Sequence, residues 1–267
     1  PLVRQRQLGI RDRYYYLAEH PGIGMSRRKE TDFFMYGHGN WARGRDWYRR
    51  QFPADAPARG ECSPNYTKRH LFGGVPERIE AVCPSAKLIY LVRDPIERTI
   101  SHYQTSRQAA REDRSFAAAV ADADESNYVL TSCYHTQLQP YLHHFPEERL
   151  LVVSTEEMTA DPQGTMRTLY RFLGVDASFR NEQVGQSFNV SAEKKQHSPW
   201  VRWVSDRVPQ ALKDRLRPHL SLHWLPGTAA PRPAPAPEVE AHLKTLFRPE
   251  VEALRALTGR AFTTWCV

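Results

Sequence analysis

The sequence predicts an α/β fold in three layers, in which helices cover both faces of a mostly parallel sheet. The first observation is a short apolar run of strand-forming residues, Lys87–Val92. The second is a helix signal directly after this run: Asp94 suits a helix N-cap, Pro95 suits the first helical position, and apolar residues then recur at helical spacing. The third is a second apolar run, Arg149–Val153, followed by a turn and a helix over 163–173. Strands that alternate with helices indicate a parallel sheet.

Helices account for most of the other predicted elements. A short helix begins at Tyr14 and stops at Pro21, and amphipathic segments predict helices over 47–52, 75–82 and 134–145. Residues 107–124 form a charged helical segment with Phe116 inward, and 156–162 form the turn before the helix over 163–173. The Pro/Ala run 229–237 predicts an extended linker, and a last helix over 238–258 is interrupted at Pro249.

The corner after the central strand is a candidate phosphate site. Arg93 lies where the strand ends, which is the usual ligand position in open α/β sheets. Arg98 and Ser101 share a helix face at a spacing of three. Guanidinium and hydroxyl groups bind phosphate through charge-assisted hydrogen bonds. A solvated turn that caps a core strand is an equally good interpretation of these residues alone.

The segment Leu91-Val-Arg93-Asp-Pro-Ile-Glu-Arg98-Thr-Ile-Ser101-His-Tyr103 resembles the 3′-phosphate-binding segment of sulfotransferases that use 3′-phosphoadenosine 5′-phosphosulfate (PAPS). The resemblance implies that Arg93 and Ser101 hold the 3′-phosphate of the nucleotide, with Arg98 beside them. The resemblance runs from about Tyr14 to the C-terminus. Within the family, the chain resembles the carbohydrate and heparan-sulfate-type O-sulfotransferases, and we expect it to be a bacterial member. This resemblance implies a P-loop-like sulfotransferase fold with residues 1–267 in one domain.

A second segment, Lys29-Glu30-Thr-Asp-Phe33-Phe34, resembles the catalytic segment of glycan O-sulfotransferases. The resemblance implies that Glu30 deprotonates the acceptor hydroxyl. It also implies that Lys29 neutralises charge that develops on the sulfuryl group. Without the resemblance, Lys29 and Glu30 are a surface charge pair before two buried aromatic residues.

Two further segments match the family. Glu61-Cys-Ser63-Pro-Asn-Tyr66 resembles the segment that lines the acceptor cleft, which implies that Ser63 and Tyr66 bind the acceptor; a plain Ser-Pro turn is the alternative. Lys194 and Lys195 lie in a basic loop, which the family folds over the adenine and 3′-phosphate; a solvated linker is the alternative. Cysteines that flank this loop in the Golgi heparan sulfate enzymes are absent, which argues against that branch.

One part of the family pattern is missing. In the family, a strand and a Lys-x-Gly-Thr-Thr-like loop that cradles the 5′-phosphosulfate precede the helix at Tyr14. Here Asp12 abuts Arg13 and Tyr14 directly. A strand and loop of this kind comprise about 12–16 residues. Because their loss would expose a strand edge, we expect the polypeptide made in the cell to contain this segment between residues 12 and 14.

Composition limits the class of ligand and the cellular location that we expect for this protein. The net charge of +7 favours an anionic ligand, but the basic residues are scattered, which argues against a nucleic acid polymer. The four cysteines are far apart and include no C-x-x-C, so neither a metal site nor a disulfide framework is expected. No apolar run approaches the roughly 20 residues of a membrane span, and no signal peptide is visible. We therefore expect a cytoplasmic protein, while the oligomeric state has no signal in the sequence.

The predicted function is sulfuryl transfer from PAPS to a hydroxyl of a carbohydrate, lipid or small metabolite. The product would be adenosine 3′,5′-bisphosphate (PAP), and the reaction demands no metal, since positioning and electrostatic stabilisation suffice for such in-line transfers. A catalytically inactive PAP-binding protein without the phosphosulfate loop is the first alternative. A P-loop kinase relative is the second, although the sequence lacks a G-x-x-x-x-G-K-[ST] motif.

Overall fold

The computed structural model describes residues 10–181, 195–196, 228–229 and 232–267, with side chains in 14–181 and 232–267. The strands, in chain order, are β1 Ile23–Met25, β2 Ala58–Gly60, β3 Leu88–Val92, β4 Leu150–Ser154, β5 Lys195–Gln196 and β6 Thr228–Ala229. The helices are α1 Ile10–Ala18, α2 Gly44–Arg49, α3 Val75–Val82, α4 Pro95–Gln108, α5 Phe116–Val120, α6 Asn127–Leu130, α7 Tyr134–His144, α8 Thr155–Ala160, α9 Pro162–Leu173 and α12 Pro237–Thr258. Short 3-10 turns are η1 Trp41–Arg43, η2 Pro64–Thr67 and η3 Glu147–Arg149.

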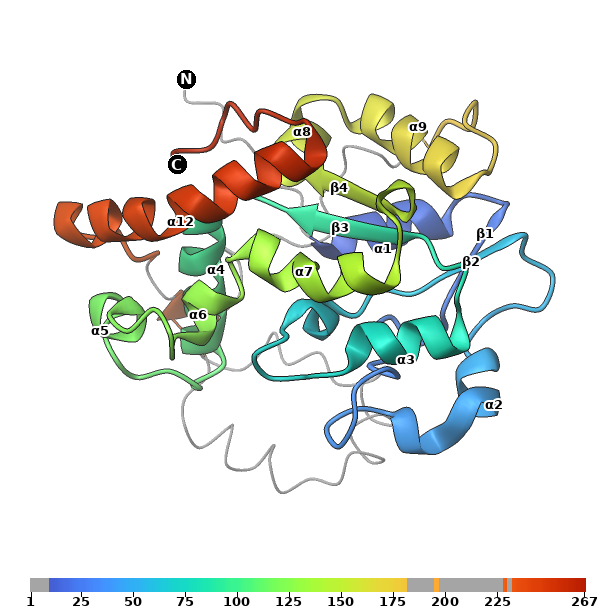
Figure 1. Ribbon diagram of the computed structural model, residues 1–267, viewed down its shortest axis with the longest axis horizontal. Coiled ribbons are helices and arrows are strands. Elements are labelled where there is room, and N and C mark those ends of the chain that lie inside the picture. Colours follow the sequence, from blue (N-terminus) through green and yellow to red (C-terminus); the bar gives the residue numbers. More distant parts are fainter. Residues whose placement is uncertain (1–9, 182–194, 197–227, 230–231) are drawn as a thin grey trace.

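Strands β3 and β4 form the centre of three layers. They pair in parallel, from Leu88 opposite Leu150 to Val92 opposite Ser154. Alternate side chains of a strand point to opposite faces. One face packs against α7 and α12 through Tyr90, Val92 and Val152. The other packs with α1, α8 and α9 through Ile89, Leu91, Leu151 and Val153. Helices thus cover both faces of a parallel pair (Figure 1), and the predicted α/β class is confirmed.

A second parallel pair continues this arrangement. Strand β1 pairs with β2 from Ile23 opposite Ala58 to Met25 opposite Gly60, and these strands contribute to the same core cluster as β3 and β4. Within the described ranges, β2 pairs only with β1, and β3 pairs only with β4. Helix α1 runs without a break through residues 12–14. Each of these four strands has a single partner among the described residues, and the missing segment stays a prediction.

The strand, turn and helix around Asp94 form as predicted. Its carboxylate accepts hydrogen bonds from the backbone N–H groups of Ile96 (2.9 Å) and Glu97 (3.0 Å), and Pro95 occupies the first turn of α4. The other carboxylate oxygen accepts the backbone N–H of Cys266 at 2.7 Å. Asp94 therefore caps α4 and also ties the C-terminal residues to this corner.

The prediction of one helical segment over 107–124 is wrong. Helix α4 ends at Gln108, Ala110 adopts a positive φ of 51°, and α5 begins only at Phe116. The Glu112 carboxylate accepts the backbone N–H groups of the next two residues, which satisfies them outside a helix. Phe116 is buried, as predicted.

Four other helix predictions need correction. Residues 155–160 form α8 rather than a turn, since Ser154 and Glu157 make a reciprocal capping box. Pro249 does not interrupt α12. A proline costs a helix one hydrogen bond, and here buried residues along the helix outweigh that cost: Leu243, Phe247, Val251 and Leu254. Helices α1 and α2 begin three or four residues earlier than predicted, at Ile10 and Gly44.

Candidate active site

The candidate catalytic residues follow β1 on an extended segment. This segment stays beside the residues after β2, because Ser26 donates its backbone N–H to Gly60 (2.9 Å). Lys29 Nζ lies 3.6 Å from a carboxylate oxygen of Glu30, whose side chain is 42% exposed. Phe33 and Phe34 are buried. The aromatic pair thus anchors the segment in the core, and Glu30 faces the solvent beside Lys29. The catalytic roles of Glu30 and Lys29 stay predictions.

The half-buried carboxylate of Glu61 fixes the backbone behind Glu30. Its two oxygens accept hydrogen bonds from the hydroxyls of Thr31, Ser63 (2.7 Å), Tyr48 (2.8 Å) and Tyr66 (3.0 Å). Burial raises the pKa of Glu61, and the four hydroxyl donors oppose that rise. Three of these hydroxyls also accept backbone N–H groups of the candidate catalytic segment: Ser63 from residue 32 at 3.1 Å, Thr31 from residue 33 at 3.3 Å and Tyr66 from residue 34 at 3.3 Å. Glu61 thus holds the catalytic segment through intermediary hydroxyls.

Ser63 and Tyr66, the predicted acceptor ligands, are both part of this network. Each donates its hydroxyl hydrogen to Glu61 and accepts a backbone N–H. Only one further lone pair remains on each hydroxyl oxygen. The structure therefore gives them a positioning role, and their contact with the acceptor stays a prediction.

Asp32 lies between the candidate base and the Glu61 network. It has a positive φ of 46°, a conformation that is costly for a residue other than glycine. Its Oδ1 atom is buried and makes no hydrogen bond with the described residues. Burial raises the pKa of this carboxyl, and the negative charge of Glu30 raises it further. A hydrogen bond with Asn65 opposes this rise in pKa. Asp32 is thus held in the segment with one buried oxygen that has no partner among the described residues.

Arg93 lies at the end of β3, where the sequence predicted it. The Tyr134 hydroxyl donates to the backbone carbonyl of Arg93 at 2.9 Å and fixes the strand end. The guanidinium Nη2 donates to Glu97 at 3.0 Å, one turn along α4. Arg232, from the segment before α12, also donates to Glu97, at 2.5 Å. Ser101 lies one further turn along the same helix face as Glu97.

Arg98, the next residue along α4 after Glu97, contacts neutral groups. Its Nη1 lies 3.5 Å from the Ser132 hydroxyl and 3.4 Å from Nδ1 of His102. Burial lowers the pKa of Arg98, and the nearby charge of Arg93 lowers it further. Burial and Arg98 together lower the pKa of His102 to about 3. Arg98 is thus close to Arg93 but contacts different residues.

Lys68 connects the two halves of the candidate site. Burial lowers its pKa, as does the charge of Arg98, whereas Asp32 and Glu30 raise it. The ammonium group therefore lies within electrostatic reach of both the catalytic segment and α4. The structure brings together residues from η2, α4 and the segment after β1, although about 30 to 70 positions separate them in the sequence.

The predicted basic loop is described only in part. Lys194 lies outside the described residues. Lys195 begins β5, whose partner is β6 with Lys195 opposite Ala229, and β5 lies beside α4. The backbone at Lys195 is thus next to the helix that carries Ser101 and Arg98, and its predicted role stays open.

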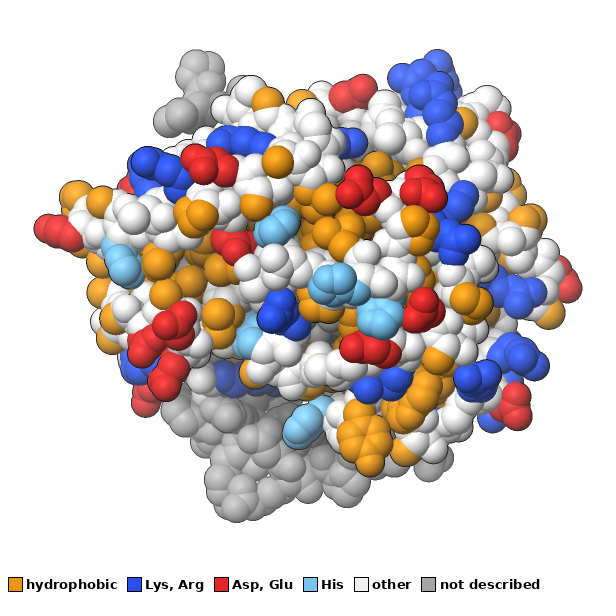
Figure 2. Space-filling model, viewed as in Figure 1, with side chains coloured by type: hydrophobic (Ala, Val, Ile, Leu, Met, Phe, Trp, Pro, Cys, Tyr) orange, Lys and Arg blue, Asp and Glu red, His pale blue; other side chains and the backbone are white. Residues whose placement is uncertain are grey.

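Metal-ligating and charged side chains are dispersed in the described part of the chain. No group of three or more His, Cys, Asp or Glu residues there is arranged to hold a metal ion. No helix described has the length and apolarity to cross a membrane. Basic and acidic side chains intermingle over the face in Figure 2, where the residues described form no continuous basic stripe.

Sequence reasoning missed four residues of this site: Asp32, Glu61, Lys68 and Arg232. Asp32 and Glu61 lay inside two of the motifs, and their acidic side chains near buried aromatic residues were the available signal. Lys68 follows the second of these motifs by two residues. Arg232 had no local signal, because its contact with Glu97 spans 135 positions.

The sequence matches the family model "Sulfotransferase domain" over residues 46–207, which is more than half of the chain and includes Arg93 and Ser101. The match begins after Lys29 and Glu30. The solved structure of a sulfotransferase from Alicyclobacillus acidocaldarius has a TM-score of 0.64 and 24% identity, and the alignment covers 94% of this chain and 91% of that one. This likeness shows a shared fold.

Three curated relatives have names that refer to heparan sulfate. The mouse heparan sulfate glucosamine 3-O-sulfotransferase 3A1 is 30% identical over 183 residues, covering 65% of this chain and 45% of the relative. The human bifunctional heparan sulfate N-deacetylase/N-sulfotransferase 2 is 26% identical, covering 65% and 22%. The mouse heparan sulfate glucosamine 3-O-sulfotransferase 5 is 26% identical, covering 97% and 71%. The chain thus spans less than half the length of the first two relatives. By the match to the domain model, this chain belongs to the sulfotransferase domain family.

Proposed function

We propose that this protein transfers a sulfuryl group from PAPS to a hydroxyl group of a carbohydrate. The observation that carries the proposal is the match to the sulfotransferase domain model over residues 46–207, which includes Arg93 and Ser101. Arg93 ends β3, and Ser101 lies two turns along α4, so both belong to the corner where β3 meets α4.

The nucleotide end of the site fits an anionic ligand. Arg93 and Arg232 both donate to Glu97, so these three groups together carry a net charge of +1. A phosphate monoester carries up to two negative charges and accepts forked hydrogen bonds from guanidinium groups. We assign the 3′-phosphate of PAPS to Arg93 and Ser101. Arg98, Lys194 and Lys195 supply further positive charge around it.

Glu30 and Lys29 would carry the acceptor chemistry. Glu30 accepts the proton of the acceptor hydroxyl as its oxygen attacks sulfur, and the bond from sulfur to the bridging phosphate oxygen of PAPS breaks. Lys29, beside Glu30, neutralises negative charge that develops on the sulfuryl and bridging oxygens. The products are a sulfate ester and PAP.

The acceptor side supports a polyhydroxylated substrate. The half-buried carboxylate of Asp32 lies two residues from Glu30 and would accept a second hydroxyl of the same sugar. The names of the curated relatives, which act on heparan sulfate glucosamine, agree with a glycan acceptor.

The four cysteines are free thiols, which fits the predicted cytoplasmic location.

Calorimetry with three nucleotides tests the nucleotide assignment. We expect PAP to bind more tightly than 5′-AMP, which lacks the 3′-phosphate, and more tightly than ATP. Arg93→Ala should weaken PAP binding by about 1.5–3 kcal/mol, the usual contribution of a hydrogen bond to a charged group, and leave 5′-AMP binding unchanged. Equal affinities for PAP and 5′-AMP in the wild type would contradict the proposal.

A further inference from the structure

Residues 259–267, which follow α12 and which we call the tail, fold into a closed loop beside the corner that carries Arg93. One guanidinium group closes this loop. Arg255 of α12 donates from Nε to the carbonyl of Ala261 at 2.8 Å and from Nη2 to the carbonyl of Val267 at 3.0 Å. The N–H donors of a guanidinium group form a rigid fork, so one side chain fixes two carbonyls relative to each other. Arg255 therefore holds the two ends of the tail together.

The aromatic residues of the tail are buried, and one of them is strained. The rings of Phe262 and Trp265 stack with their centroids 4.3 Å apart, and both side chains are buried. Phe262 has a positive φ of 46°, a conformation that is costly for a residue other than glycine. Such a conformation persists only where the surrounding contacts enforce it, and residues of this kind are concentrated at functional sites. The packing of the two rings is thus strong enough to keep the tail in one strained conformation.

Trp265 contacts the residue that fixes the end of β3. Its ring centroid lies 5.9 Å from that of Tyr134. The Tyr134 hydroxyl donates to the carbonyl of Arg93 at 2.9 Å and accepts the N–H of Arg93 at 3.3 Å. A single hydroxyl thus pairs with both backbone groups of Arg93. A shift of the Tyr134 ring would therefore move the backbone from which the Arg93 side chain extends.

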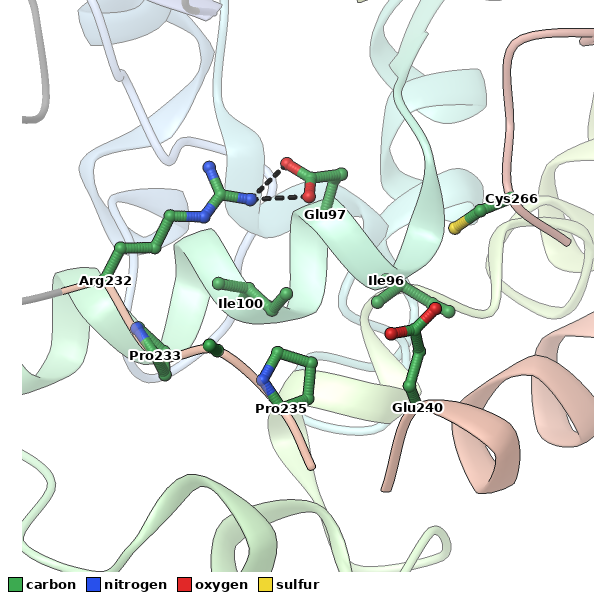
Figure 3. Close-up of a pocket in the computed structure, with 9 residues that line it drawn as sticks. Ile96, Glu97, Ile100, Arg232, Pro233, Pro235, Glu240 and Cys266 are labelled. Carbon is green, nitrogen blue, oxygen red and sulfur yellow. Dashed lines mark hydrogen bonds and ion pairs between the residues drawn. The ribbon is translucent and has the colours of Figure 1, made fainter. Parts of the chain in front are cut away.

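Cys266 contacts the residue that follows Arg93. Its N–H and its thiol donate to the same carboxylate oxygen of Asp94, at 2.7 Å and 2.9 Å. Figure 3 shows the Cys266 side chain pointing from the tail toward the start of α4, where Ile96 lies. The other oxygen of Asp94 caps α4. The tail therefore reaches Arg93 through Tyr134 and reaches the next residue directly.

We propose that Arg255 is a positioning residue for the nucleotide: by closing the tail, it holds Arg93 where the 3′-phosphate accepts its hydrogen bonds. This inference rests on the proposed function, because Arg93 is the residue through which Arg255 acts. A guanidinium group that is held in place before the ligand arrives loses less conformational entropy on binding, which raises the affinity. Arg255 acts on the nucleotide through the backbone of the tail.

Titration calorimetry of the full chain with PAP and 5′-AMP tests this inference. We expect Arg255→Ala to bind PAP about 3- to 10-fold more weakly, because Arg93 must then be ordered on binding. The variant should bind 5′-AMP, which lacks the 3′-phosphate, as the wild type does. Arg255→Lys, which keeps the charge and loses the fork, should lie between the two. In an Arg93→Ala background, Arg255→Ala should cause no further loss of PAP affinity, since the effect passes through Arg93.

Arg78→Ala is the matched control. Arg78, on α3, also donates to two backbone carbonyls, those of Phe34 and Gly73, each at 2.6 Å. Its removal therefore costs the same charge and the same number of hydrogen bonds at a place remote in sequence from Arg93. Urea unfolding establishes that each variant is folded, and the control should bind PAP like the wild type. If Arg255→Ala does not fold, Arg255→Lys takes its place in every comparison.

Several outcomes would overturn the inference. One is a folded Arg255 variant that binds PAP as tightly as the wild type while Arg93→Ala weakens binding, and the proposed function then stands. Another is a loss of PAP affinity that Arg78→Ala shows equally, or that persists in the Arg93→Ala background, because the tail would then affect only the stability of the fold. If wild-type protein binds PAP no better than 5′-AMP, the inference and the proposed function are both overturned.

Discussion

Removing the Glu61 carboxylate should have two effects: it should destabilise the protein, and it should displace the candidate catalytic segment. Four hydroxyls donate to this side chain, and one of them belongs to the fully buried Thr31. In Glu61→Ala these hydroxyls lose their acceptor in a buried space, and leaving buried polar groups unsatisfied costs about 1–3 kcal/mol each. Because the half-buried hydroxyls of Tyr48, Ser63 and Tyr66 regain hydrogen bonds with water, we expect a total loss of about 3–5 kcal/mol in the free energy of unfolding.

Glu61→Gln should cost less, because the amide keeps the shape and one acceptor oxygen. Its NH2 group then faces two hydroxyls that must rotate to accept, so we expect about 1–3 kcal/mol. Urea unfolding followed by circular dichroism at pH 7 measures both losses. Glu80→Ala is the control, since Glu80 is 46% exposed and its ion pair is with the His144 ring; it should change stability by less than about 1 kcal/mol.

A double-mutant cycle tests the connection to the catalytic segment. Glu61→Gln combined with Thr31→Val should be non-additive by about 1 kcal/mol or more, since the two side chains share one hydrogen bond. Sulfate transfer should fall further than PAP affinity, because Thr31 adjoins Glu30. Additive effects, or a Glu61→Ala variant within about 1 kcal/mol of the wild type, would refute the reasoning.

Two further predictions concern charge and chain composition. The folded pKa of His102 is about 3, below its ordinary 6.5, so the unfolded chain binds a proton more readily than the folded protein between these values. The free energy of unfolding should therefore fall as pH drops below about 6.5, by up to about 1.4 kcal/mol per pH unit, and His102→Gln should remove this dependence in urea unfolding. An NMR titration that gives His102 a pKa near 6 would contradict the prediction. Protein isolated from the cell that makes it should yield a chymotryptic peptide with an insertion between Asp12 and Tyr14, whereas an uninterrupted peptide Gly9–Tyr14 would show that nothing is inserted there.

Local signals explain which parts of the fold the sequence predicts. The unit around Asp94 was predicted because a cap, a proline and a spaced apolar stripe lie within about ten residues. The same kind of signal was present at Ser154 and Glu157, whose capping box marks α8. Pro249 was misleading, because the burial of α12 against the rest of the chain outweighs a local helix breaker.

Only the residues of the candidate site that lie within a short sequence motif could be predicted from the sequence. Arg93, Ser101 and Glu30 lie in such motifs. The contacts that organise them are long-range: Glu61 reaches back 30 positions to Thr31, and Arg232 reaches 135 positions to Glu97. No periodicity or spacing in the sequence encodes such pairs, since packing of separate elements creates them.

Transfer of labelled sulfate from PAPS tests the central claim most directly. Wild-type protein is incubated with ³⁵S-labelled PAPS and a panel of glycan hydroxyl acceptors, including unsulfated heparosan oligosaccharides, and Glu30→Gln is measured in parallel. We predict labelled glycan and stoichiometric PAP with the wild type, and a rate about 10²–10⁴-fold lower for the variant at unchanged PAP affinity. Equal rates in the two proteins would exclude Glu30 as the base. If PAP binds tightly but the wild type labels no acceptor, the protein is a nucleotide-binding protein without transfer activity, and the central claim is wrong.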